Sequence, residues 1–146
     1  MGFDFDISHE NMSVILDWKL QYENVKPLLV VGGSETTRAD LMSKFGQNYF
    51  EYTVFTNLKN NEEICDYMNE HEPGRDMIFF LEKSLSDMIV PTETILILNN
   101  AHSCDGIWPL LKYVHDSNSD IFIAATGEFT EEQIAAAAEY TMLLRL

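Results

Sequence analysis

Three short apolar runs, each followed by a polar loop and an amphipathic stretch, constrain the fold of this chain most. The runs are PLLVV from Pro27, TILIL from Thr94 and IFIAAT from Ile121. Apolar runs without alternation are typical of strands that are buried on both faces, as in parallel sheets covered by helices. The chain therefore predicts an α/β domain, a three-layer sandwich with a mainly parallel sheet of about five strands.

Alternation and capping signals predict the remaining elements. YTVFTNL, from Tyr52, alternates and is rich in β-forming residues, which predicts a further strand. RDMIFFLEKSLSDMI predicts a helix with Leu85 and Met88 facing inward, whereas the closing run TMLLRL fits either a helix or a strand. The predicted helix ends are a cap at Ser8, a capping box at Thr37 and Asp40, a stop at Gly46, and a second capping box at Thr130 and Gln133.

The length of 146 residues fits a single domain. We expect residues 1–146 to form one unit, with residues 1–26 as a helical lead-in and residues 27–146 as the sheet core. No apolar run approaches the ~18–20 residues of a membrane span. The acidic N-terminal stretch, MGFDFDISHENMS, lacks the layout of a signal peptide, so we expect a cytoplasmic protein with no membrane partner.

The charge of the chain limits its partners. Its 24 acidic and 9 basic side chains give a formal net charge of −15. Such a surface repels nucleic-acid phosphates and acidic lipids, and it opposes binding of a triphosphate. We therefore expect no direct nucleic-acid partner.

The two cysteines, Cys65 and Cys104, are far apart in sequence and form no C-x-x-C pair. This spacing indicates neither a disulfide framework nor a zinc knuckle, and we expect two buried free thiols. His102 and Asp105 lie near Cys104, but zinc requires four ligands. We expect no metal site.

The stretch VVGGSETTRADL lies in the strand–loop–helix setting of a phosphate-binding loop. Laid on the first glycine, the pattern G-x-x-x-x-G-K-[ST] requires Gly, Lys and Ser or Thr at positions 37, 38 and 39. The sequence departs from the pattern at all three positions. The candidate nucleotide-binding residues are Gly32, Gly33, Ser34, Glu35, Thr36, Thr37, Arg38 and Ala39.

Four further stretches extend this similarity along nearly the whole chain. They are LDWK before KPLLVVGG, then FGQNYFEYTVFTNLKNNEEI, TILILNNAHSCDGIWPLLKYVHDSNSDIFIAATGEF and EYTMLLRL. In order and spacing the chain resembles the bacterial and archaeal AAA-superfamily P-loop ATPases that usually carry a C-terminal nuclease-like domain. The resemblance implies a P-loop core and a final strand at TMLLRL. The additional C-terminal domains of that family are expected to be absent.

The resemblance also assigns family roles to positions where this chain carries other residues. Arg38 occupies the position of the Walker A lysine, and Ala39 that of the following Ser or Thr. The Walker B pair, normally Asp then Glu, falls on Asn99 and Asn100. The sensor-like positions are Thr126 and Gly127, which are followed by Glu128 in place of a small polar residue.

These replacements remove most of the chemistry of an ATPase. Arg38 keeps a charge with a different geometry, and Ala39 has no hydroxyl for Mg²⁺. The amide of Asn100 cannot accept a proton at neutral pH, and Glu35 adds negative charge close to the loop. Phosphoryl transfer depends on positioning and charge, so we expect no enzyme activity.

We therefore interpret the chain as a catalytically inactive AAA-like domain that acts as a protein-binding or scaffold module, with no required cofactor. One alternative is a nucleotide-binding domain that binds ATP, with or without Mg²⁺, with weak or no hydrolysis. In a second alternative, the chain is an acidic decoy that binds a basic nucleic-acid-binding protein.

Overall fold

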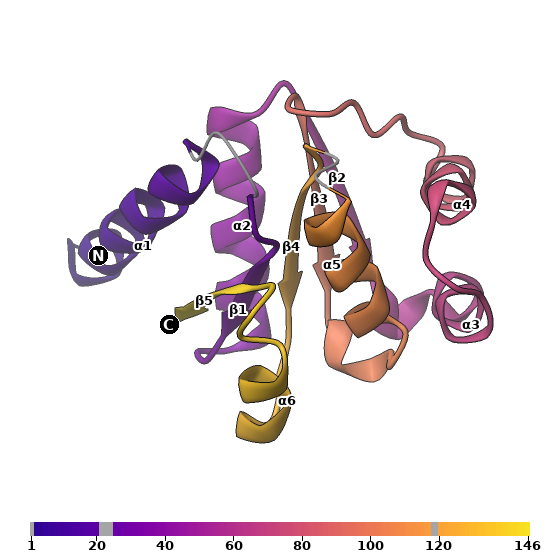
Figure 1. Cartoon of the computed structure of the whole chain (residues 1–146). Coiled ribbons are helices and arrows are strands. Elements are labelled where there is room, and N and C mark those ends of the chain that lie inside the picture. Colours follow the sequence, from indigo (N-terminus) through magenta and orange to yellow (C-terminus); the bar gives the residue numbers. More distant parts are fainter. Residues whose placement is uncertain (1, 21–24, 118–119) are drawn as a thin grey trace.

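The computed structural model describes residues 2–20, 25–117 and 120–146, with side chains from residue 11 onward. Its centre is a five-stranded sheet in which every paired strand is parallel (Figure 1). The strand order is β2-β3-β4-β1-β5, and the strands are β1 Leu28–Val31, β2 Tyr52–Asn57, β3 Thr94–Asn99, β4 Phe122–Thr126 and β5 Met142–Arg145. The predicted fold class is confirmed, and the closing run is a strand.

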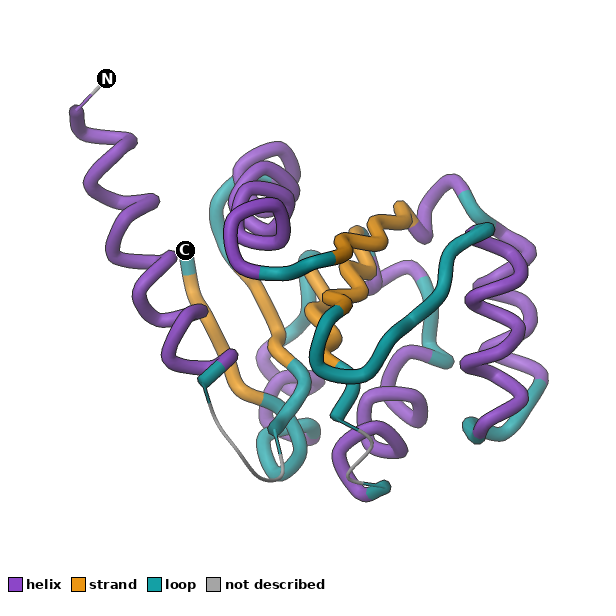
Figure 2. The backbone as a smooth tube through the Cα atoms, turned by 90° about the horizontal axis from the view of Figure 1, so that it is seen from above, coloured by secondary structure: helices purple, strands orange, loops and turns teal. Residues whose placement is uncertain are grey.

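Helices cover both faces of the sheet (Figures 1 and 2). One face packs on α1 Gly2–Lys19 and α2 Glu35–Tyr49. The other face packs on α3 Glu62–Glu70, α4 Arg75–Leu85, α5 Ile107–Asp116 and α6 Glu131–Ala136. Two short 3₁₀ turns, η1 Leu58–Asn60 and η2 Ala101–Ser103, follow β2 and β3.

Apolar and polar residues do not alternate along β3, because helices cover both faces of the sheet. All six residues of the strand are buried, and its four apolar side chains alternate between the two cores. Leu96 and Leu98 contribute to one core, and Ile95 and Ile97 contribute to the other. Both faces of the strand are covered, so both sets of side chains must be apolar.

Trp18 belongs to the core on the α1 side. It is fully buried and meets the ring of Phe122 edge-on, with 5.2 Å between the ring centroids. Its indole N–H donates to the backbone carbonyl of Lys26. Trp18 is therefore a core residue, whereas Tyr22, four residues further on, lies outside the described residues.

Several helix ends differ from the sequence prediction. α1 begins at Gly2, so Ser8 lies inside the helix rather than at its cap. α2 is capped by Ser34, whose Oγ accepts from the Thr37 N–H at 3.0 Å, instead of by Thr37. α2 also continues past Gly46, because that glycine serves packing: a Cβ there would lie 2.5 Å from Thr53 Oγ1.

At one further helix end the sequence prediction is correct, and at another it is wrong. The capping box of Thr130 and Gln133 is present as predicted. α4 ends at Leu85, where Ser86 adopts a left-handed conformation with φ 54°, so Met88 lies beyond the helix and is 71% exposed. Its predicted inward position is therefore wrong.

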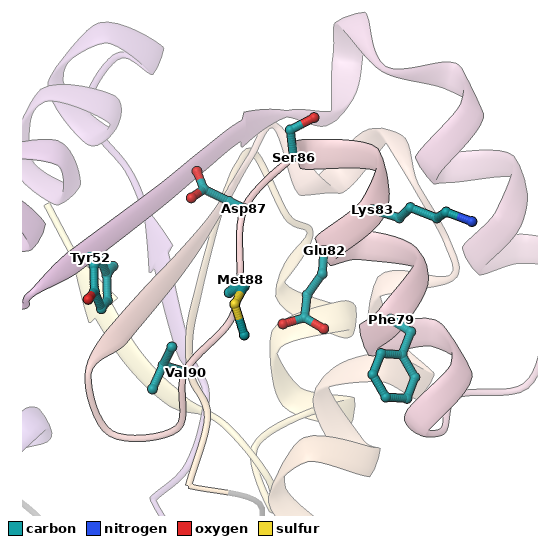
Figure 3. A pocket seen from close by; sticks show the side chains of 8 residues that line it. All are labelled: Tyr52, Phe79, Glu82, Lys83, Ser86, Asp87, Met88 and Val90. Carbon is teal, nitrogen blue, oxygen red and sulfur yellow. The ribbon is translucent and has the colours of Figure 1, made fainter.

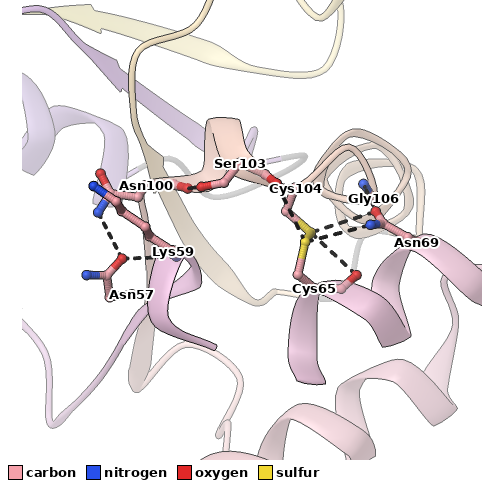
Figure 4. Close-up of a disulfide and its surroundings, with 8 residues drawn as sticks. All are labelled: Asn57, Lys59, Cys65, Asn69, Asn100, Ser103, Cys104 and Gly106. Carbon is pink, nitrogen blue, oxygen red and sulfur yellow. Dashed lines mark hydrogen bonds between the residues drawn. A yellow bond between two sulfur atoms is a disulfide. The ribbon is translucent and has the colours of Figure 1, made fainter. Parts of the chain in front are cut away.

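The prediction of two free thiols is also wrong, because Cys65 and Cys104 form a disulfide (Figure 4). The bond joins α3 to the residue after η2, with 5.5 Å between the two Cα atoms. The sequence separation of 39 residues conceals this proximity, which arises only when α3 packs beside the end of β3.

Among the described residues, no helix is both long enough and apolar enough to cross a membrane. The same residues contain no group of three or more His, Cys, Asp or Glu side chains placed to hold a metal ion. The expectations of a cytoplasmic location and of no metal requirement stay predictions.

Candidate functional site at the carboxyl end of the sheet

The loops after β1, β3 and β4 meet at the carboxyl end of the sheet, where open parallel sheets bind their ligands. Gly127 N–H donates to Val30 O at 3.2 Å, which joins the β4 loop to β1. Asn100 Nδ2 donates to Glu35 Oε1 at 2.7 Å, which joins the β3 loop to the start of α2. The three altered motifs of the sequence therefore come together in space.

The loop after β1 is shorter than the family pattern implies. Only Gly32, Gly33 and Ser34 separate β1 from α2, and both glycines have positive φ angles, 81° and 60°. The residues from Thr36 to Ala39 therefore lie in the first turns of α2 instead of in a phosphate-wrapping loop.

Gly32 also permits a close approach of the C-terminal segment. A Cβ on Gly32 would lie 2.7 Å from the backbone O of Leu146, whose N–H donates to Val31 O at 2.8 Å. The backbone oxygen of Leu146 therefore closes one side of the loop after β1.

Arg38 turns back from α2 into the loop and is only 2% exposed. Its Nη1 donates to Gly32 O at 2.9 Å and to Gly33 O at 3.2 Å. Its buried Nε has no hydrogen-bond partner among the described residues. Within the described part of the chain, no carboxylate forms an ion pair with this guanidinium.

Asn100 links several segments of the site, and Figure 4 shows its contacts with Asn57 and Ser103. It has a left-handed backbone conformation, with φ 55° and ψ 41°, and is 2% exposed. Its Nδ2 donates to Glu35 Oε1 at 2.7 Å and to Asn57 Oδ1 at 2.8 Å. Both amide hydrogens are therefore used, and Ser103 Oγ donates to its backbone carbonyl at 2.7 Å.

Asn57 is a member of this network that the sequence did not identify. It ends β2 beside Asn99 of β3, and its Oδ1 also accepts from the Lys59 N–H at 3.1 Å. The available signal was its position at the end of a predicted strand, where parallel neighbours place their polar ends together.

Asn99 and the β4 loop form a second network. Thr126 Oγ1 donates to Asn99 Oδ1 at 2.6 Å, and both side chains are buried. His102 Nδ1 accepts from the Glu128 N–H at 3.0 Å. A Cβ on Gly127 would lie 2.6 Å from that same ring nitrogen, so the glycine lets the loop approach His102.

A hollow of about 330 Å³ lies beside these networks and is lined partly by Arg38, Phe129, Glu131 and Arg145. Arg145 and Glu131 form a two-point ion pair across its rim, with N···O distances of 2.7 and 3.1 Å. The hydrogen bonds from Arg145 hold the pKa of the Glu131 carboxyl below its ordinary value. The charges of Arg145 and Glu131 therefore neutralise each other.

Comparison with known proteins supports the fold. No protein-family model matches the chain, and no curated protein matches it in sequence. The structure of PCH-2 from C. elegans, an AAA+ ATPase, is similar to 99% of this chain, with a TM-score of 0.57 and 13% sequence identity. The chain spans 43% of the length of PCH-2. At this identity the likeness shows a shared α/β fold.

Proposed function

We propose that this chain is a catalytically inactive AAA-like domain that serves as a protein-binding or scaffold module. One observation carries the proposal. Asn100, at the position that the resemblance assigns to the Walker B glutamate, donates its two amide hydrogens to Glu35 and Asn57. A side chain held in this way neither accepts a proton from water nor is free to orient it.

The β1 loop supports the same conclusion. The Arg38 guanidinium binds the loop's own carbonyls, whereas a Walker lysine binds the β- and γ-phosphates. Ala39 offers no hydroxyl to Mg²⁺. Because phosphoryl transfer depends almost wholly on positioning and charge, these losses act together.

The charge of Glu35 opposes a bound triphosphate as well. Its carboxylate lies in the site and is fixed by Asn100. Repulsion between such a carboxylate and a phosphate costs about 1–4 kcal/mol at ~4 Å, depending on the local dielectric.

Phosphate release from Mg-ATP tests the proposal. We expect the wild-type chain and an Arg38→Ala/Asn100→Ala variant to release phosphate at the same background rate. Circular dichroism of both proteins checks that the variant is folded. Hydrolysis by the wild type well above the variant would refute the proposal.

A second candidate, a nucleotide binder without turnover, has one observation in its favour. The buried Arg38 Nε lacks a hydrogen-bond partner in the part of the chain that the structure describes, and the residue lines the 330 Å³ hollow. Thermal-shift titration with ATP, ADP and GTP, each with and without Mg²⁺, separates the candidates. Stabilisation that rises with ligand concentration supports binding, and none at millimolar ligand eliminates it.

A further inference from the structure

The edge strand β2 lacks the features that normally protect a sheet edge. Among the described strands it pairs only with β3, in an unbroken register from Tyr52 to Asn57. Its sequence, YTVFTN, contains no charged residue, proline or glycine. Natural proteins usually place lysine, proline or a bulge at such an edge, because an unprotected strand pairs with other chains.

The backbone groups of β2 divide between its two sides. Tyr52 N–H donates to Glu93 O at 3.1 Å, so the backbone of Tyr52 faces β3. Because parallel pairing alternates along a strand, the N–H and C=O groups of Thr53 and Phe55 point to the outer edge. Phe55 is 40% exposed and Tyr52 is 48% exposed, so the edge also presents aromatic surface.

An open groove of about 680 Å³ begins at the same strand (Figure 3). Tyr52 and Val90 line one side of it, Phe79 lies on the opposite side on α4, and Met88 lies between them. Phe79 is 65% exposed and Met88 is 71% exposed. Large apolar side chains gathered at an open edge mark an interaction surface.

The acidic side chains around the groove favour a partner with basic side chains. Glu82 and Asp87 line the groove. Glu51 directly precedes Tyr52 in the sequence, and Glu93 directly precedes the first residue of β3. Lys83 is the single basic residue among those that line the groove. A second copy of this chain would bring a further net charge of −15 to an acidic surface, which opposes self-association.

We propose that β2 and this groove bind an extended segment of another protein that alternates apolar and basic residues. The segment adds as a strand to the outer edge of β2, through the backbone groups of Thr53 and Phe55. Its apolar side chains contact Tyr52, Phe79 and Met88. Its basic side chains are attracted by the acidic residues around the groove, which are Glu51, Glu82, Asp87 and Glu93. Backbone pairing gives affinity in this mode, and side-chain pockets give specificity. The inference rests on the proposed protein-binding role but not on the loss of ATPase activity.

The test uses a fluorescein-labelled peptide of five Lys-Val repeats and the whole chain. We expect saturable binding by fluorescence anisotropy, and at least tenfold weaker binding by a Phe79→Ser/Met88→Ser variant. Both side chains are exposed, so the variant should fold. Leu20→Ser, which replaces an apolar side chain 57% exposed on another part of the surface, is the matched control and should bind like the wild type.

Two further measurements separate strand addition from simple charge attraction. The same peptide with N-methylated backbone amides keeps its charge but should bind at least tenfold more weakly. Hydrogen exchange should slow at the Thr53 and Phe55 amides when the unmodified peptide binds. Absent binding, equal binding by the double variant or the N-methylated peptide, or unprotected edge amides would each overturn the proposal, whatever the result of the ATPase assay.

Discussion

The carboxyl end of the sheet and the outer edge of β2 differ in what their polar groups already bind. At the carboxyl end, Asn100, Glu35 and Asn57 satisfy one another. At the β2 edge, backbone groups of Thr53 and Phe55 face outward beside exposed aromatic rings. The polar groups of the candidate site are therefore satisfied within the chain, whereas those of the β2 edge are directed away from the sheet.

The largest expected effect concerns the disulfide between Cys65 and Cys104. It joins α3, which follows β2, to the turn after β3, and its cysteines are 39 residues apart. Closing a loop of this length stabilises the fold by roughly 4 kcal/mol in the chain-entropy model. We expect dithiothreitol to lower the urea midpoint of the wild type accordingly.

A Cys65→Ala/Cys104→Ala variant is the control for this measurement. Its midpoint should be low and should not change with reductant. An equal midpoint for the wild type with and without dithiothreitol would show that the bond contributes nothing to stability.

Replacing Asn100 tests whether the closed network at the carboxyl end is structural. Asn100→Ala removes two part-buried hydrogen bonds and places alanine in a left-handed conformation, and should cost about 3 kcal/mol of unfolding free energy. Asn100→Gly tolerates that conformation and should cost roughly 1 kcal/mol less. Urea unfolding of the three proteins measures both differences. Wild-type stability of Asn100→Ala would mean that the network is not structural.

The smallest expected effect is at the exposed pair of Arg145 and Glu131. Because Arg145 lowers the pKa of Glu131, the pair stabilises the fold above the ordinary pKa of a glutamate. That contribution is lost as the pH falls through the lowered pKa. Arg145→Ala should therefore be slightly less stable than the wild type at pH 7 and equal to it in acid, as measured by thermal unfolding across pH. A difference that grows in acid would contradict this assignment.

Local signals in the sequence predicted the elements well. Both apolar runs from Thr94 and Ile121 are buried strands, and the capping box at Thr130 is present. Periodicity left the last strand open, because β5 has only four residues. The capping-box pattern of Thr37 and Asp40 predicted the wrong cap for α2, because Ser34, three residues earlier, is the capping side chain.

The contacts that define the candidate site were less predictable. The bond from Asn100 to Glu35 spans 65 residues, and that from Asn100 to Asn57 spans 43. The disulfide between Cys65 and Cys104 likewise joins residues far apart in sequence, 39 positions from each other. Such contacts depend on strand order and helix packing, which no local pattern specifies.

Hydrogen exchange of the whole chain compares the two regions in one experiment, since exchange slows where an amide becomes protected by a ligand. One sample contains millimolar Mg-ATP, and the other contains the Lys-Val peptide. We predict slower exchange at Thr53 and Phe55 with the peptide, and unchanged exchange across residues 33–37 with Mg-ATP. Protection of residues 33–37 by Mg-ATP, with none at the β2 edge, would contradict the assignment of binding to that edge.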